Sequence, residues 1–460
     1  MRTLSRYTII SQRACIMRSR FLASVLLVLL AASSGQLARA GGVAPCEEPI
    51  VFEGSAVNVL VLPYAAGVGF DERVTAVGTR LGLLIQQDSL IRLAKYSSIA
   101  VVDLVPRLAG QTQRPCSPAT VLGMVLGRTP GAPRHIQPGK GVVLVWGSIY
   151  QEKDDIYIQT FARFLRNGET ETITATPPDA KSNTIRFTGN VPWQSFAFEP
   201  HRVTQADLDN IEKTYEQLAR LHTQASDSAP ATPLLRDPAV PVAYQVLEIK
   251  GEWMRVKELY FGKEGWLRSS GSNTKWPLLD RMPELNFIDG LVGYLQYKEA
   301  LAGKGPQVSA KTAAMLGSDA FQRYERGAAS SAPEARAASM SLRAVMMLDP
   351  QQANLSGPVE LFSQSATLAP QSAEARNLQT MFRAARCCAS SDPAKEEQAI
   401  VANFLGALSL DPGNRNLVAN LESFYSLLAS RPDGQHAFDT NELSKRLVQV
   451  RDVKAHLKQE

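Results

Sequence analysis

The chain has 460 residues, of which 45% are hydrophobic and 20% charged, with 49 basic and 44 acidic side chains and a net charge of +5. Six of the basic residues and none of the acidic ones lie in the first forty positions, so the rest of the chain has 43 basic and 44 acidic residues and a net charge of −1. This balance gives no support for nucleic-acid binding, which requires an excess of positive charge. The remaining length is sufficient for about two to four domains.

The first forty residues have the order of features that is typical of a secretory signal peptide. Arginines precede an apolar run of twelve residues from Phe21 to Ala32, and the small-x-small sequence Ala38-Arg39-Ala40 follows. The apolar run is shorter than the ~20 residues that a membrane-spanning helix needs. We therefore expect residues 1–40 to be removed, and a periplasmic protein without a transmembrane segment to remain. Translation from Met1 and translation from Met17 both fit this pattern.

Two pairs of cysteines bear on the redox state of the exported chain. Cys46 and Cys116 are candidates for a disulfide, because the periplasm is oxidising, although spacing alone does not show that their Cβ atoms meet. The adjacent residues Cys387 and Cys388 are expected to be two small residues of a helix, because a disulfide between neighbours strains the backbone.

Residues 41–222 are predicted to form a first domain in which strands and helices alternate. Apolar runs at 57–62, 99–105 and 142–150 predict buried strands, and alternation over 156–164 predicts a fourth strand in a hairpin. Helices are expected at 74–95, at 117–126 and, closing the domain, at 208–222. The order β-α-β-α-β-β predicts a mixed sheet with helices packed on it.

Two segments of this domain carry a resemblance to known families. The strand that ends in Leu62-Pro63-Tyr64 and the segment Leu144-Val145-Trp146-Gly147-Ser148-Ile149 resemble the amino-terminal domain of the translocation protein TolB. They are also similar to a domain of the curli secretion lipoprotein family. The resemblance covers residues 55–166 and implies a binding and assembly domain without catalysis. The chain departs from TolB because no propeller repeats follow, and from curli secretion proteins because no membrane-inserting hairpins are evident.

A linker and a second, smaller module are predicted to follow. Residues 223–239 are rich in Ser, Ala and Pro, which is typical of a linker. Residues 240–275 hold three short strand-like segments that resemble a bacterial Src-homology-3-like module, which implies a small β-barrel that binds cell-wall peptides or other proteins. The candidate groove residues of this module are Tyr244, Trp253, Tyr260 and Trp266. The alternative is that the aromatic side chains fill the small core of the barrel.

Residues 285–460 are predicted to form an all-helical domain. The segment is rich in Ala, Leu, Ser, Gln and Glu, and helices are expected at 319–328, 334–348 and 443–457. Leu348-Asp349-Pro350, Leu368-Ala369-Pro370 and Leu410-Asp411-Pro412 each end a helical stretch, because proline cannot continue a helix. These endings resemble tetratricopeptide repeats, although the prolines are 20 and 42 residues apart. The resemblance implies stacked helices with a face for peptides or proteins, and a helical domain without a ligand is the alternative.

The sequence contains no recognisable catalytic or metal-binding motif. Its histidines form no His-Glu-x-x-His pattern, no Gly-x-Ser-x-Gly occurs, and two Cys-x-x-Cys pairs are lacking. We therefore expect no enzyme activity, no cofactor and no metal. Because a catalytic triad is assembled only in space, an envelope hydrolase with no recognisable motif is kept as an alternative.

Together these patterns predict a multidomain α+β protein of the cell envelope, with a mixed-sheet domain, a small β-barrel and a C-terminal helical-repeat domain. We expect a non-catalytic interaction or scaffold protein that binds envelope proteins or peptidoglycan. A secretion or surface-organelle assembly factor is the second hypothesis, and it would form homo-oligomers through the first domain.

Overall fold

By its internal contacts the chain divides into Met1–Pro45 and Cys46–Glu460. The predicted signal peptide lies outside the described residues. The computed structural model describes residues 52, 54–67, 70, 72–96, 99–103, 117–125, 141–166, 172–177, 185–190, 195–218, 220–233, 242–259, 262–268, 278–303, 308–328, 332–348, 356–387, 392–431 and 437–457.

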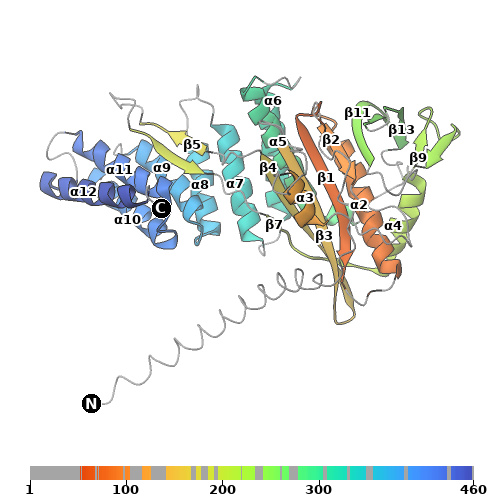
Figure 1. Cartoon of the computed structure of the whole chain (residues 1–460), viewed down its shortest axis with the longest axis horizontal. Helices are drawn as coiled ribbons and strands as arrows, with labels where there is room; N and C mark the ends of the chain where they lie inside the picture. Colours follow the sequence, from red (N-terminus) through yellow and green to blue (C-terminus); the bar gives the residue numbers. More distant parts are fainter. Residues whose placement is uncertain are drawn as a thin grey trace, which may run out of the picture. The chain divides into compact units, whose positions relative to one another are not determined.

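A mixed sheet gathers strands from distant parts of the sequence (Figure 1). Among the described residues it has 11 strands in the order β10-β9-β13-β12-β11-β2-β1-β3-β4-β7, with β8 paired to β4. The central strand β1 is parallel to both β2 and β3, whereas β3 and β4 form an antiparallel hairpin. The strands of this sheet are β1 (Val57–Ala66), β2 (Ile99–Asp103), β3 (Gly141–Glu152), β4 (Asp155–Arg166), β7 (Phe196–Ala197), β8 (His201–Val203), β9 (Arg220–His222), β10 (Ala231–Pro233), β11 (Val242–Lys250), β12 (Trp253–Glu258) and β13 (Glu264–Arg268).

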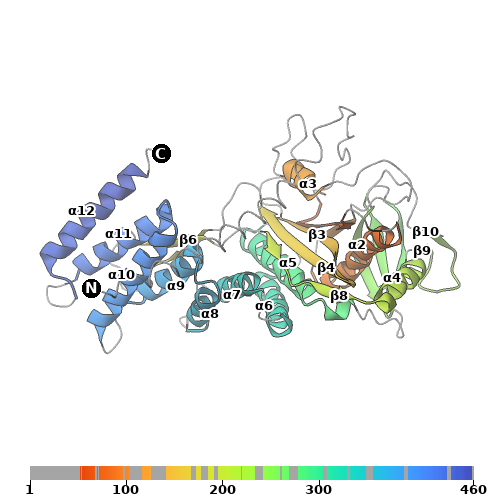
Figure 2. The same ribbon diagram turned by 90° about the horizontal axis from the view of Figure 1, so that it is seen from below.

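Helices cover both faces of the central strands, and alternate residues of β1 are therefore buried on opposite sides of the sheet. Val57, Val59 and Val61 belong to the core that includes α2 (Glu72–Leu93) and α4 (Gln205–Leu218). Leu60 and Leu62 pack instead with α3 (Pro118–Val125), which Figure 2 shows away from α2. The predicted order β-α-β-α-β-β and the predicted mixed sheet are therefore confirmed.

Tyr64 and Gly147, which belong to the two segments that resemble TolB, lie beside each other in the sheet. The parallel pairing of β1 and β3 shifts in register between Val61 and Tyr64, around Pro63, and then aligns Tyr64 with Gly147. A Cβ atom on Gly147 would lie 2.0 Å from Cδ1 of the Tyr64 ring. The glycine therefore provides the space in which the buried tyrosine ring lies.

The segment predicted to form a small barrel is part of the large sheet. Strands β11, β12 and β13, which were expected to form a separate barrel, continue the large sheet, because β11 pairs antiparallel with β2. The described residues of this segment therefore do not form a separate small β-barrel. The pairing extends the backbone hydrogen bonding of β2, whose edge would otherwise lack a partner strand on that side. Residues 223–233, expected to be linker, contain β10, which forms a hairpin with β9.

The C-terminal region is helical, as predicted, and each helix packs on the next. Side chains of Ser309, Ser372, Asp392, Asn414 and Asp439 accept a hydrogen bond from the backbone N–H three residues later and so begin five of these helices. The endings predicted at Leu368 and Leu410 are confirmed, whereas Pro350 lies outside the described residues. The helices are α5 (Glu284–Leu301), α6 (Ala310–Gly327), α7 (Pro333–Met347), α8 (Ser356–Leu368), α9 (Ala373–Ala385), α10 (Pro393–Leu410), α11 (Arg415–Ala429) and α12 (Thr440–His456), preceded by a short 3-10 helix (Leu279–Arg281).

Substitution of Gly147 by alanine should destabilise the sheet. In Gly147→Ala the new methyl group would overlap the Tyr64 ring, and we expect the free energy of unfolding to fall by about 3 kcal/mol, at the upper end for an overpacked core. Urea unfolding measures this change. The control Gly54→Ala adds a methyl group with no atom within 4 Å and should leave stability nearly unchanged. Equal urea midpoints for Gly147→Ala and wild type would contradict the close approach of Tyr64.

Candidate functional site

The helical region holds a short β-hairpin that comes from the sequence of the first domain. Strands β5 (Thr172–Ala175) and β6 (Phe187–Asn190) pair with each other and form a two-stranded sheet separate from the large one. In Figures 1 and 2 this hairpin lies beside α9, and β6 contacts both α9 and α11. Residues more than 180 positions apart in sequence therefore meet here.

Two buried asparagines bind the main chain of Thr188 in β6. Asn420 accepts a hydrogen bond at Oδ1 from the Thr188 N–H (2.6 Å) and donates one from Nδ2 to the Thr188 carbonyl oxygen (2.7 Å). Asn377 donates a second hydrogen bond to the same carbonyl oxygen (3.0 Å). Asn420 also donates to Oδ1 of Asn377 (2.7 Å), which couples the two side chains. The carboxamide of Asn420 thus takes the place of a neighbouring strand, because it supplies one donor and one acceptor to the same residue.

Glu374 extends this main-chain recognition by two residues. Its Oε2 accepts a hydrogen bond from the N–H of Asn190 (3.3 Å). Its Oε1 accepts one from Nδ2 of Asn414 (2.9 Å), the residue that caps α11. Asn414, the N-cap of α11, therefore orients the Glu374 carboxylate of α9 toward the main chain of β6.

The side chains of β6 alternate between the helices and the outside. Phe187 is completely buried, and its ring centroid lies 6.5 Å from that of Phe424 on α11. At Gly189 a Cβ atom would lie 2.7 Å from Cδ2 of Leu378 and 2.8 Å from Sδ of Met381. Thr188 and Asn190 are only partly buried. We call the surface that holds β6 the asparagine face, and its residues are Glu374, Asn377, Leu378, Met381, Asn420 and Phe424.

The asparagine face was not found by sequence reasoning, although the sequence contains a signal for it. Asn377 and Asn420 are 43 residues apart and begin the similar segments Asn-Leu-Gln-Thr-Met-Phe and Asn-Leu-Glu-Ser-Phe-Tyr. A search for repeated helix segments, rather than for repeated prolines, would have paired α9 with α11. What the sequence does not show is that a strand from residue 187 onward lies against them.

Of the aromatic residues predicted to line a groove, the structure brings Trp253 and Trp266 to one face of the sheet and Tyr244 to the other. Tyr244 pairs with Glu258, so it lies on the opposite face of the sheet from Trp253, and it is buried in the core. Trp253 and Trp266 share the other face and are partly buried; His222 pairs with Trp266 and its ring lies 4.8 Å from that of Trp253. Tyr260 lies outside the described residues.

The candidate disulfide residues Cys46 and Cys116 also lie outside the described residues. Cys387 lies two residues beyond the end of α9 and is disulfide-bonded, so its interpretation as one of two small helix residues was wrong. The other cysteines of the chain fall outside the part that the structure describes.

A second polar cluster lies where α5 meets the sheet. Glu284 is 1% exposed and binds His201 Nε2 (2.9 Å) and the hydroxyl of Thr160 (2.8 Å), which is in turn 2.8 Å from the hydroxyl of Tyr64. A carboxylate, an imidazole and a hydroxyl in contact suggest nucleophilic catalysis. Thr160 is completely buried, however, so a substrate has no access to its hydroxyl. The cluster therefore joins α5 to the sheet rather than forming an active site.

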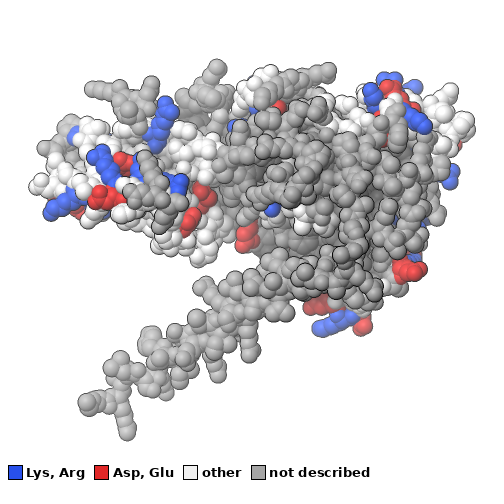
Figure 3. Space-filling view, viewed as in Figure 1, with Lys and Arg blue, Asp and Glu red and all other residues white. Residues whose placement is uncertain are grey.

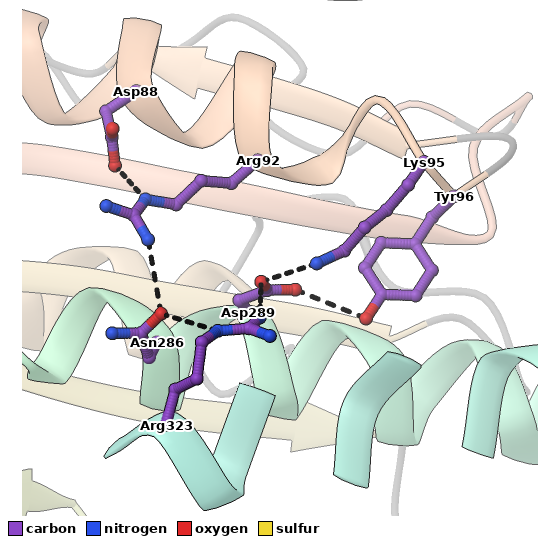
Figure 4. A network of polar contacts seen from close by, with 7 residues as sticks. All are labelled: Asp88, Arg92, Lys95, Tyr96, Asn286, Asp289 and Arg323. Carbon is purple, nitrogen blue, oxygen red and sulfur yellow. Dashed lines mark hydrogen bonds and ion pairs between the residues drawn. The ribbon is translucent and has the colours of Figure 1, made fainter. Parts of the chain in front are cut away.

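A third cluster joins α2 to α5 and α6 (Figure 4). Asp289 is 2% exposed and accepts hydrogen bonds from Lys95 (2.7 Å) and from the Tyr96 hydroxyl (3.2 Å). Arg323 of α6 lies 3.4 Å from the same carboxylate. Burial raises the pKa of Tyr96 far above its usual range, and the charge of Asp289 raises it further, so the hydroxyl stays protonated and donates. Arg92 continues the cluster by bridging Asp88 and Asn286.

Comparison with known proteins adds no family to this description. No family model, curated protein or solved structure matches the chain. Within the described residues, no group of His, Cys, Asp and Glu is arranged to hold a metal ion. None of the helices described is long and apolar enough to cross a membrane.

His201 should make the stability of the chain depend on pH. Burial opposes the charge of the imidazole, but the hydrogen bond and negative charge of Glu284, together with Glu199, outweigh it and raise the pKa of His201. A raised histidine pKa stabilises the folded chain fully below the unfolded value of about 6.5, and this contribution is lost as pH rises through the folded pKa. The stability difference between wild type and His201→Gln should therefore shrink as pH rises.

Urea unfolding from pH 6 to pH 9 tests this, together with His201→Gln and the control His456→Gln, which changes an exposed histidine on α12. The control should follow the wild-type profile. A difference between wild type and His201→Gln that stays constant over this range would show that Glu284 does not hold a protonated imidazole.

Proposed function

We propose that this protein is a non-catalytic interaction protein of the bacterial envelope whose C-terminal helices bind extended polypeptide segments of partner proteins. The observation that carries the proposal is the grip of Asn377 and Asn420 on the main chain of Thr188. Recognition through main-chain N–H and C=O groups gives affinity for an extended strand largely irrespective of its sequence. The proposal thus makes the asparagine face a site for polypeptides.

The burial of both asparagines supports this reading. Asn377 and Asn420 are completely buried, and a buried carboxamide without partners is costly. Helices that only pack on each other would be served better by apolar residues at these positions. Their polar groups face a strand, as a peptide-binding face requires.

The mixed distribution of charged side chains also favours recognition of a partner's main chain over attraction of an oppositely charged partner. On the face shown in Figure 3, basic and acidic side chains are intermingled over α10 to α12. Glu422, for example, pairs with both Arg451 and Lys454. The near-neutral net charge of residues 41–460 agrees with a polypeptide partner rather than a nucleic acid.

The signal-peptide pattern and the family resemblances of the sequence support a periplasmic location for the proposed activity. The signal-peptide pattern of residues 1–40 supports export. The resemblance of residues 55–166 to the amino-terminal domain of TolB, and that of the helices to tetratricopeptide repeats, supports a role in assembling proteins. We propose these three assignments together with the binding role.

Alanine at the two asparagines should strongly reduce partner capture. The tagged chain is expressed in its own periplasm, crosslinked and analysed by mass spectrometry. In Asn377→Ala/Asn420→Ala the main-chain groups of a bound strand lose their partners, each at a cost of about 1–3 kcal/mol, so specific partners should fall by at least about tenfold.

The matched control is Asn416→Ala, which changes a partly exposed asparagine on α11 four residues before Asn420. It should recover the same partners as wild type. If the double variant, folded as judged by its unfolding midpoint, also recovers them undiminished, the asparagine face is not the binding site.

A further inference from the structure

The asparagine face selects more than an extended main chain, because it distinguishes three successive positions of β6. At the first position Phe187 fills a fully buried space against Phe424. At the second, Asn377 and Asn420 bind the main chain of Thr188. At the third, a Cβ atom would lie 2.7 Å from Cδ2 of Leu378 and 2.8 Å from Sδ of Met381, so glycine fits without movement and a larger residue requires both side chains to shift.

The side chains at the positions of Thr188 and Asn190 do not determine binding to the asparagine face. The burial of β6 alternates, with Phe187 and Gly189 buried and Thr188 and Asn190 partly exposed. Asn420 and Glu374 recognise Thr188 and Asn190 through the main-chain N–H groups of these two residues. The face is therefore shaped for an aromatic residue, any residue and a glycine in a strand.

The hairpin that occupies the face is separable from the rest of the fold. It belongs to a two-stranded sheet that shares no pairing with the large sheet among the described residues. A two-stranded hairpin is at best marginally stable in water by itself. Its order thus depends on the helices, and its replacement by another strand leaves the large sheet intact.

We propose that the asparagine face is a binding site for extended segments with the motif aromatic-x-Gly, and that hairpin β5–β6 is an internal ligand which such a segment of a partner protein replaces. This inference rests on the proposed function, since it specifies the ligand of the same face. The partner is a protein that presents an exposed strand or an unfolded segment with this motif. The hairpin and the partner segment then compete for the same hydrogen bonds of the asparagine face.

The test measures binding of a fluorescently labelled peptide with the sequence of residues 172–190 to the chain from residue 41 to residue 460. In Gly189→Leu the chain's own hairpin clashes with Leu378 and Met381 and leaves the face open. We expect this variant to bind the peptide at least about tenfold more tightly than wild type does, because the peptide no longer competes with the hairpin.

Two matched controls isolate the motif. A peptide in which leucine replaces its glycine, and one in which alanine replaces its phenylalanine, should each bind Gly189→Leu at least about tenfold more weakly than the parent peptide. Adding Asn420→Ala to Gly189→Leu should weaken the parent peptide by a similar factor. Equal binding of all three peptides would overturn the aromatic-x-Gly motif and leave the general proposal of strand binding standing.

A measurement on the wild-type chain covers the case in which Gly189→Leu does not fold. An excess of the parent peptide should raise the hydrogen exchange of residues 185–190 in wild type, because the displaced strand loses its hydrogen bonds, whereas the leucine-containing peptide should not. No change in exchange at peptide saturation, or no peptide binding to a folded Gly189→Leu chain, would overturn the internal-ligand proposal. Partner capture that still depends on Asn377 and Asn420 would then retain the proposed function with a different ligand.

Discussion

The structure depends on helix α5, which has no face turned to solvent for most of its length. Every residue from Phe287 to Tyr297 is buried, because the sheet and α2 cover one side of the helix and α6 and α7 cover the other. The helix therefore has to be apolar nearly all round, unlike a surface helix with one apolar stripe. Its two buried acids each require partners. Glu284 finds His201 and Thr160, and Asp289 finds Lys95, Tyr96 and Arg323, so the sheet and the helical region are joined by bonds that neither can satisfy alone.

The same requirement operates at the asparagine face with a different outcome. Asn377 and Asn420 are as deeply buried as Glu284, but their partners are main-chain atoms of a two-stranded hairpin instead of side chains of a large sheet. Ion pairs around α5 lock two parts of the chain, whereas carboxamide contacts to a main chain accept any strand of the right shape. Under the proposed function, this difference separates a contact that maintains the fold from one that a partner strand replaces.

Much of the fold was accessible to sequence reasoning, because local patterns decide local structure. The apolar run of β1, the spacing of apolar residues in α2 and the prolines after Leu368 and Leu410 each correspond to an observed element. The barrel predicted at residues 240–275 is not observed, and the reason lies outside that segment. Its first strand pairs with β2 across more than a hundred residues of sequence, and no pattern within the segment shows whether such an edge is taken. The residues of the proposed binding face were missed for the same reason, since the contacts of Asn377 and Asn420 with Thr188 join distant parts of the sequence.

By itself the sequence determined where the long strands of the first domain and several helices form, that a mixed sheet precedes a helical region, and that charge and motifs give no support for nucleic-acid binding or recognisable catalysis. These properties follow from periodicity, capping and composition, which act over a few residues. Only the tertiary structure decided that Tyr64 lies over Gly147, that Glu284 meets His201, and that β6 lies on α9 and α11. The physical reason is that a buried polar group or a missing side chain specifies that a partner must exist but not which distant residue supplies it.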